Sequence, residues 1–172
     1  MSLSIIDEPG IFAKPEIIPQ GATSLVVASK HVSASGNPAL AVHATGNRTH
    51  EALYGGNPEQ LSFVDPLGIM RALRTLRIES AKKGLQIEVT MEAMHHGPTS
   101  FEIPVVFVEI GSGPLEWSDP ALGEIGAMAA MAAVNPVRVI NFPCGGVWGY
   151  TLSSQTHSNL SGGQTGYRTC HV

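Results

Sequence analysis

The sequence predicts an α/β fold: a mixed, mostly parallel sheet with helices on both faces. Three observations indicate this class: short apolar runs typical of buried strands, two longer segments with helix signals, and the alternation of the two kinds along the chain. With 172 residues, 43% hydrophobic and 14% charged, the chain can bury one substantial core. We therefore expect one α/β core over residues 1–142 and an irregular tail over residues 143–172.

The first half of the chain predicts two strands and a helix. Residues 1–21 are interrupted by prolines and indicate an extended lead-in. The apolar runs over residues 23–29 and 39–42 predict buried strands. Asp65 followed by Pro66 predicts the start of a helix, because aspartate is a favoured N-cap and proline fits the first helical position.

The second half predicts three more strands and another helix. Residues 86–91 alternate polar and apolar side chains, and residues 103–110 form an apolar run, so both are expected to be strands. A second helix, rich in Ala and Met, is expected over residues 118–133, followed by a strand over residues 137–142.

Histidines and one acid stand at the ends of four predicted strands. His31 and His43 follow the first two strands, His95 and His96 follow the third, and Glu109 closes the fourth. If these strands are adjacent and parallel, the five side chains converge at one edge of the sheet. Imidazoles with a carboxylate suit an open zinc site, or a histidine general base oriented by Glu109 and assisted by backbone oxyanion donors. Both schemes point to hydrolysis, and the residues alone leave both open.

Other functional classes lack their motifs. The chain has no phosphate-binding G-x-x-x-x-G-K-[ST] loop, no G-x-G-x-x-G after a strand and no G-x-S-x-G elbow. A net charge of -4 gives no general signature for nucleic acid, so no DNA partner is expected. Cys144 and Cys170 form no C-x-x-C pair, and neither a signal peptide nor a membrane span is visible, so a cytoplasmic protein without a membrane partner is expected.

Three cationic side chains share one face of the first predicted helix: Arg71, Arg74 and Lys82. A solvated helix face explains them adequately. The alternative is a patch that contacts the phosphates of RNA.

Four motifs occur in the same order as in the archaeal- and plant-type D-aminoacyl-tRNA deacylases, which the chain resembles over about residues 22–133. They are Ala28-Ser29-Lys30-His31-x-Ser33, Val42-His43-x-Thr45-Gly46-Asn47, Met91-Glu92-Ala93-Met94-His95-His96-Gly97-Pro98 and Val108-Glu109-Ile110-Gly111-Ser112. The resemblance implies a fold akin to peptidyl-tRNA hydrolases and phosphorylases, and a monomeric, zinc-dependent enzyme. It also implies hydrolysis of the ester between a D-amino acid and tRNA, which recycles mischarged tRNA.

The same resemblance implies roles for the matched residues. The catalytic set is His95, His96 and Glu109, and the metal set is His31, His43, His95, His96 and Glu109. The substrate-binding set is Lys30, Asn47, Gly97 and Thr99. Two alternatives stay open: a metal-binding module on the same scaffold, and an inactive, truncated fragment of the family.

The resemblance fails at both ends. Family members begin with a further strand and helix, and they continue through a Gly-Gly-x-His-Tyr motif into a sizeable C-terminal portion, so the core is expected to be incomplete. After Phe142 the composition shifts to Gly, Ser, Thr and Gln without apolar periodicity. We expect the chain to be read out of frame from a point between about Asn135 and Cys144.

The genetic code supports the out-of-frame reading. A one-base forward shift from Gly146 allows Gly-Phe-Gly-Gly-Thr-His-Tyr, in the place where the family has its motif. The 172-residue chain is therefore expected to be inactive or nearly so. Codons at Gly149 to Leu152 that cannot give Gly-Thr-His-Tyr when shifted would refute this expectation.

Overall fold

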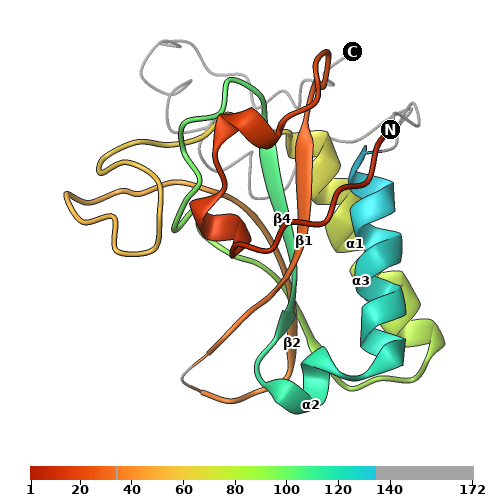
Figure 1. The fold of residues 1–172 in the computed structure, drawn as a ribbon. Coiled ribbons are helices and arrows are strands. Elements are labelled where there is room, and N and C mark those ends of the chain that lie inside the picture. Colours follow the sequence, from red (N-terminus) through yellow and green to blue (C-terminus); the bar gives the residue numbers. More distant parts are fainter. Residues whose placement is uncertain (34, 135–172) are drawn as a thin grey trace, which may run out of the picture. The chain divides into compact units, whose positions relative to one another are not determined.

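The computed structural model describes residues 1–33 and 35–134, and a four-stranded mixed sheet forms the centre of this part of the chain (Figure 1). Its strands are β1 (Leu25–Lys30), β2 (Ala39–Ala44), β3 (Glu88–Met91) and β4 (Val105–Gly111). They lie in the order β1-β4-β2-β3. β1 runs parallel to β4 and β2 parallel to β3, whereas β2 and β4 are antiparallel. The predicted α/β class with a mixed sheet is confirmed.

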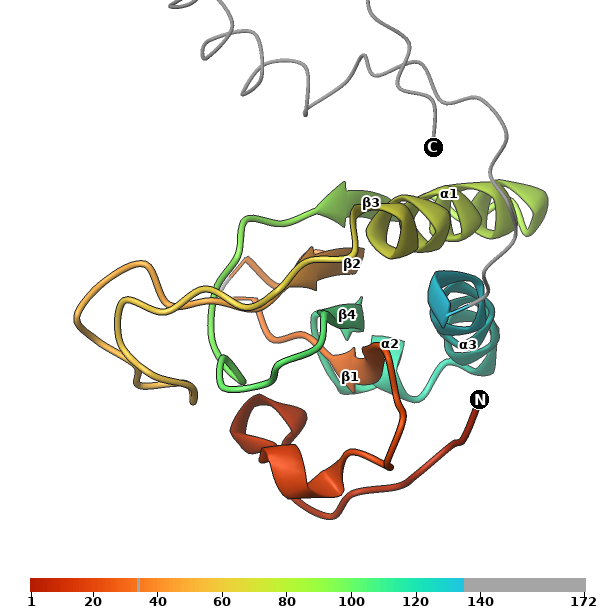
Figure 2. The ribbon, with the colours of Figure 1, turned by 90° about the horizontal axis from the view of Figure 1, so that it is seen from above.

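The two long helices lie on the same side of this sheet, as Figure 2 shows. The helical segments are η1 (Gly10–Phe12), η2 (Pro15–Ile17), α1 (Pro66–Lys82), α2 (Pro114–Trp117) and α3 (Pro120–Val134). α1 begins as predicted, because the Asp65 side chain accepts a hydrogen bond from the Gly68 backbone N–H at 2.8 Å.

The second face of the sheet is covered differently from the expectation. Instead of long helices, the proline-rich N-terminal segment with the short 3₁₀ turns η1 and η2 packs there. Proline removes a backbone donor and fixes φ, so a segment with Pro9, Pro15 and Pro19 cannot build a long helix. The class of fold is as predicted, and the cover on this face is short and irregular.

Strand alternation divides the interior into two cores. Leu40 and Val42 of β2, with Val106 and Val108 of β4, point toward α1 and α3. The residues between them point to the opposite face of the sheet, where Phe107 packs with Ala13, Phe101 and Val105. His43 and Glu109 occupy odd-numbered positions, so they face away from the long helices.

Some expectations lie outside the described residues. These are the strand over residues 137–142 and the tail over residues 143–172. Within the described part of the chain, no helix is long and apolar enough to cross a bilayer.

Candidate active site

The predicted histidines and Glu109 meet on one face of the sheet, and the geometry differs from the expected one. The expectation was that four parallel strands would bring their carboxyl ends to one edge. β2 is antiparallel to β4, so their carboxyl ends point in opposite directions. Pleat alternation brings the groups together instead: Glu109 lies opposite Ser29 in the β1–β4 register, and His43 lies opposite Phe107 in the β2–β4 register.

Glu109 lies at the centre of the site and is only 3% exposed. One carboxylate oxygen, Oε1, accepts a hydrogen bond from the Ser29 hydroxyl at 2.6 Å. The other, Oε2, lies 3.3 Å from Nε2 of His43 and 3.5 Å from Nδ1 of His31. Burial alone would raise the pKa of Glu109, but the hydrogen bonds from His43 and Ser29 outweigh it and hold the pKa below its ordinary value. The carboxylate is therefore negatively charged at neutral pH.

Three imidazole rings pack together beside this carboxylate. The rings of His43 and His95 stack with centroids 4.3 Å apart, and His96 meets both rings edge-on. In each ring, Nδ1 lies within hydrogen-bond distance of a backbone carbonyl: 2.9 Å for His43, 2.8 Å for His95 and 2.6 Å for His96. A carbonyl oxygen can only accept, so each Nδ1 carries the proton and donates it. Nε2 of His95 and His96 is then left for a metal ion or a proton, an arrangement typical of metal-binding histidines, whereas Nε2 of His43 faces the Glu109 carboxylate.

His96 is held in an unusual backbone conformation. Its φ is +48°, in the left-handed region that residues other than glycine seldom adopt. Its carbonyl accepts a hydrogen bond from the Gly46 N–H at 2.9 Å. Burial is the largest cause that lowers the pKa of the His96 imidazole to about 4. The ring is thus neutral at pH 7 and able to accept a proton.

A second cluster adjoins the three imidazoles. His31 lies between two acids, with Nδ1 3.5 Å from Glu109 and Nε2 3.8 Å from Glu92. The other oxygen of Glu92 lies 3.7 Å from Nε2 of His95, so Glu92 links the two clusters across the opening of the site. Glu92 is 22% exposed in its side chain and His95 is 40% exposed, so solvent reaches this side.

Both clusters fit a divalent metal ion. One offers His43, His95 and His96, and the other offers His31, Glu92 and Glu109, with the ligand atoms of each cluster within 4.8 Å of one another. Imidazole nitrogens and carboxylate oxygens are the donors that zinc accepts in hydrolytic sites. The donor set therefore agrees with the expected zinc.

Three of the predicted substrate-binding residues hold a loop in place beside the histidines. The Asn47 side chain donates to the carbonyls of Gly55 and Asn57 at 2.8 and 3.1 Å, and the Thr99 hydroxyl accepts from the Asn57 N–H at 2.7 Å. A Cβ on Gly97 would come within 2.3 Å of a backbone nitrogen in the same loop, so only glycine fits there. Asn47 and Thr99 are buried, and the contacts of all three are with this loop.

Lys30, the fourth predicted substrate-binding residue, lies apart from the histidines. Its ammonium group sits 4.8 Å from the ring centroid of Trp117, in a cation–π contact at the end of β1. It alternates with Ser29 along the strand, so the two side chains leave opposite faces.

The cationic set on α1 does not form one free patch. Arg71 is mostly buried and donates to the carbonyls of Ala132 and Ala133 at 2.9 and 2.7 Å, so it caps the last turn of α3. Lys82 pairs with a glutamate of its own helix, and Arg74 is exposed. α1 lies on the side of the sheet opposite the histidines (Figure 2), so these residues are not beside the site.

Sequence reasoning missed Ser29 and Glu92 as site residues. Both lie inside the motifs that contain the histidines: Ser29 is two residues from His31, and Glu92 is three residues from His95. That proximity was a signal, but Ser29 could be assigned only once the β1–β4 register was known.

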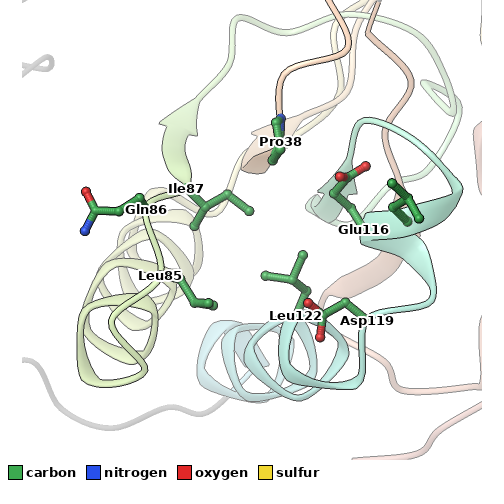
Figure 3. A pocket seen from close by; sticks show the side chains of 8 residues that line it. Pro38, Leu85, Gln86, Ile87, Glu116, Asp119 and Leu122 are labelled. Carbon is green, nitrogen blue, oxygen red and sulfur yellow. The ribbon is translucent and has the colours of Figure 1, made fainter.

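A pocket of about 240 Å³ lies elsewhere, between the start of β3, α2 and α3 (Figure 3). It is lined by Pro38, Leu85, Gln86, Ile87, Leu115, Glu116, Asp119 and Leu122. Both of its carboxylates accept hydrogen bonds from backbone N–H groups near the start of a helix: Glu116 from Gly113 at 2.9 Å, and Asp119 from Ala121 at 2.7 Å. None of the predicted site residues lines it.

Comparison with known proteins connects the site to a family. The chain is 36% identical over 125 residues to a D-aminoacyl-tRNA deacylase of Methanosarcina mazei, which covers 73% of this chain and 42% of that protein. It is 45% identical over 104 residues to a D-aminoacyl-tRNA deacylase of Hyperthermus butylicus, covering 59% and 38%. The chain thus spans less than half the length of these relatives.

A solved structure and a family model agree with these relatives. The crystal structure of "conserved protein of unknown function AF0625" matches with a TM-score of 0.69 and 31% sequence identity, covering 77% of this chain and 48% of that one. The sequence model of the family described as D-aminoacyl-tRNA deacylase matches residues 18–149, a range that contains all four histidines and both acids of the site. The chain therefore belongs to the D-aminoacyl-tRNA deacylase family.

Proposed function

We propose that the clustered histidines and Glu109 form the hydrolytic centre of a D-aminoacyl-tRNA deacylase, which cleaves the ester between a D-amino acid and tRNA and so recycles mischarged tRNA. The observation that carries the proposal is the convergence of His43, His95 and His96, each with Nδ1 donating to a backbone carbonyl. Family membership supports the proposed substrate class. We further propose that the protein acts as a monomer in the cytoplasm, with neither DNA nor a membrane as partner.

Zinc is part of the proposal. His43, His95 and His96 would hold an ion through Nε2, and His31 and the two acids form an adjoining donor group. A bound zinc ion would supply Lewis acidity toward water and the ester carbonyl. The fit rests on the donor types and on the anchored Nδ1 atoms, which fix the orientation of each ring.

The side chains themselves can move and hold protons. In the alternative scheme without a bound metal ion, Nε2 of the neutral His96 ring is free and can accept a proton from an attacking water molecule. Glu109 remains charged and faces Nε2 of His43 and Nδ1 of His31, so it can stabilise positive charge on either ring. Glu92, at the opening of the site, lies 3.7 Å from Nε2 of His95 and adds a second carboxylate beside the rings.

An assay with paired substrates tests the proposal. Hydrolysis of D- and L-aminoacyl-tRNA is measured for the 172-residue chain and for the longer Methanosarcina mazei relative, each with and without a chelator. In the relative, we expect faster hydrolysis of the D-substrate and sensitivity to the chelator. Alanine at the positions aligned with His95 or His96 should lower the rate by about two or more orders of magnitude.

The same assay separates the alternatives. Metal bound without hydrolysis by either protein would favour a metal-binding module. Activity in the relative alone would favour an inactive fragment. Alanine at a position aligned with His50, whose side chain is 90% exposed, is the control and should change nothing. Near-normal hydrolysis rates in both variants, at the positions aligned with His95 and His96, would refute the assignment of these histidines to the hydrolytic centre.

A further inference from the structure

The two oxygens of the Glu109 carboxylate have separate partners. Oε2 faces the rings of His31 and His43, whereas Oε1 accepts a hydrogen bond of 2.6 Å from the hydroxyl of Ser29. A carboxylate can rotate about its terminal bond, and this rotation decides which oxygen faces the imidazoles. The Ser29 hydrogen bond removes that freedom by holding Oε1 on the β1 side.

The sheet register places the Ser29 hydroxyl beside the Glu109 carboxylate. Ser29 is paired with Glu109 across the parallel β1–β4 ladder. The preceding pair on the same face, Val27 with Phe107, is apolar. Along this face of β1 and β4, the side chains thus change from apolar to polar at the Ser29–Glu109 pair. A hydroxyl facing a charged carboxylate can only donate to it.

The contact also bears on how the carboxylate tolerates burial. Glu109 is 3% exposed, and a buried carboxylate without partners is costly. The hydrogen bond from Ser29 to Oε1 offsets part of that cost. Ser29 offers no ring nitrogen to a metal ion, so its contribution is to hold the acid.

We propose that Ser29 is a positioning residue: its hydroxyl fixes Glu109 so that Oε2 is presented to His31 and His43, and this raises the affinity of the site for a divalent metal ion. The proposal rests on the metal-binding part of the proposed function and not on the identity of the substrate. Groups that orient a ligand in this way typically change metal affinity by about 10–100-fold when they are removed.

Two substitutions whose side chains have the same shape as each other isolate the effect of the hydroxyl at position 29 in the full chain. Ser29→Thr keeps the donor and Ser29→Val replaces it with a methyl group, and both residues suit a strand. Zn²⁺ affinity is measured by competition with a chromophoric chelator, and the Co²⁺ absorption spectrum reports the ligand arrangement. Ser33→Ala, at a half-buried serine whose hydroxyl contacts that of Ser35, is the control.

The expected result is an affinity for Zn²⁺ about tenfold or more lower in Ser29→Val, with an altered Co²⁺ spectrum. Ser29→Thr and the control should stay within about twofold of the unsubstituted chain. Equal affinities and spectra for the Thr and Val variants would overturn the proposal, and so would absence of metal binding by the unsubstituted chain. Metal binding by this chain, with no hydrolysis of aminoacyl esters by either this chain or the longer relative, would refute the proposed function alone. The comparison of Thr with Val would still decide the role of Ser29.

Discussion

Replacing Glu109 with glutamine removes the charge at the centre of the site while nearly preserving its shape. The amide oxygen can still accept from Ser29, but an amide nitrogen then takes the place of Oε2 beside His43 and His31. Hydrogen bonds to charged groups contribute about 1.5–3 kcal/mol each. Both ring contacts, at 3.3 and 3.5 Å, are longer than the best charge-assisted bonds, so we expect a total loss of about 2 kcal/mol.

Thermal unfolding of the metal-free chain at pH 7 measures this loss. For a protein of this size about 2 kcal/mol corresponds to a fall in Tm of about 4–8 °C. Because the folded pKa of Glu109 is lowered, its stabilisation is present above the ordinary value of 4.5 and is lost as the pH falls through the folded pKa. The difference between Glu109→Gln and the unsubstituted chain should therefore shrink in acid.

Glu59→Gln is the matched control. Glu59 also lies 3.4 Å from a histidine, but both side chains are largely exposed, so the change should cost less than about 1 kcal/mol. Glu109→Gln should in addition lower the metal content of the purified chain. An unchanged Tm together with an unchanged metal content would mean that Glu109 only packs at the end of a strand.

Three further predictions follow from single residues. The metal-free chain should lose stability between pH 6.5 and about 4, because the folded state keeps His96 neutral while the unfolded state binds a proton there, and His96→Asn should flatten that loss. An unchanged dependence of the free energy of chemical unfolding on pH would contradict this. Gly97→Ala should lower the free energy of unfolding by about 2 kcal/mol or more because its Cβ has no room, whereas Gly123→Ala, in open space on α3, should be neutral or slightly stabilising in urea titrations. Neutralising Arg74 and Lys82 should leave the salt dependence of tRNA binding unchanged if that helix face is only solvated, and a flatter slope would make it a phosphate contact.

The order and kind of the main elements could be predicted because they depend on local pattern. The apolar runs gave β1, β2 and β4, and the Asp65 cap marked the start of α1 within one residue. The alternation before His95 gave β3. Short elements escaped prediction: η1, η2 and α2 are each only three or four residues long and carry no periodicity.

Strand direction and side-chain partners could not be predicted, because both depend on pairing between distant residues. Nothing local to β2 indicates that it runs antiparallel to β4. For the same reason Arg71 resembled a surface cation, although it donates to carbonyls at the end of α3, 61 and 62 residues away in sequence. The hydrogen bonds from the Asn47 amide to two loop carbonyls were equally invisible in the sequence, and its substrate contact stays a prediction.

The site itself was found for a partly different reason from the one expected. His31, His43, His95, His96 and Glu109 do converge, but on a face of the sheet, through the alternation of side chains. Histidines near strand ends were a sufficient signal for the set. The two residues that complete it, Ser29 and Glu92, needed the three-dimensional contacts.

X-ray absorption at the zinc edge of the zinc-loaded chain tests the central claim, that the clustered imidazoles and carboxylates form a metal-dependent hydrolytic centre. The account predicts a shell of nitrogen and oxygen atoms at about 2.0–2.2 Å with the outer scattering of imidazole rings. A shell of sulfur at about 2.3 Å, from Cys144 or Cys170, or a chain that retains no zinc after desalting, would contradict it.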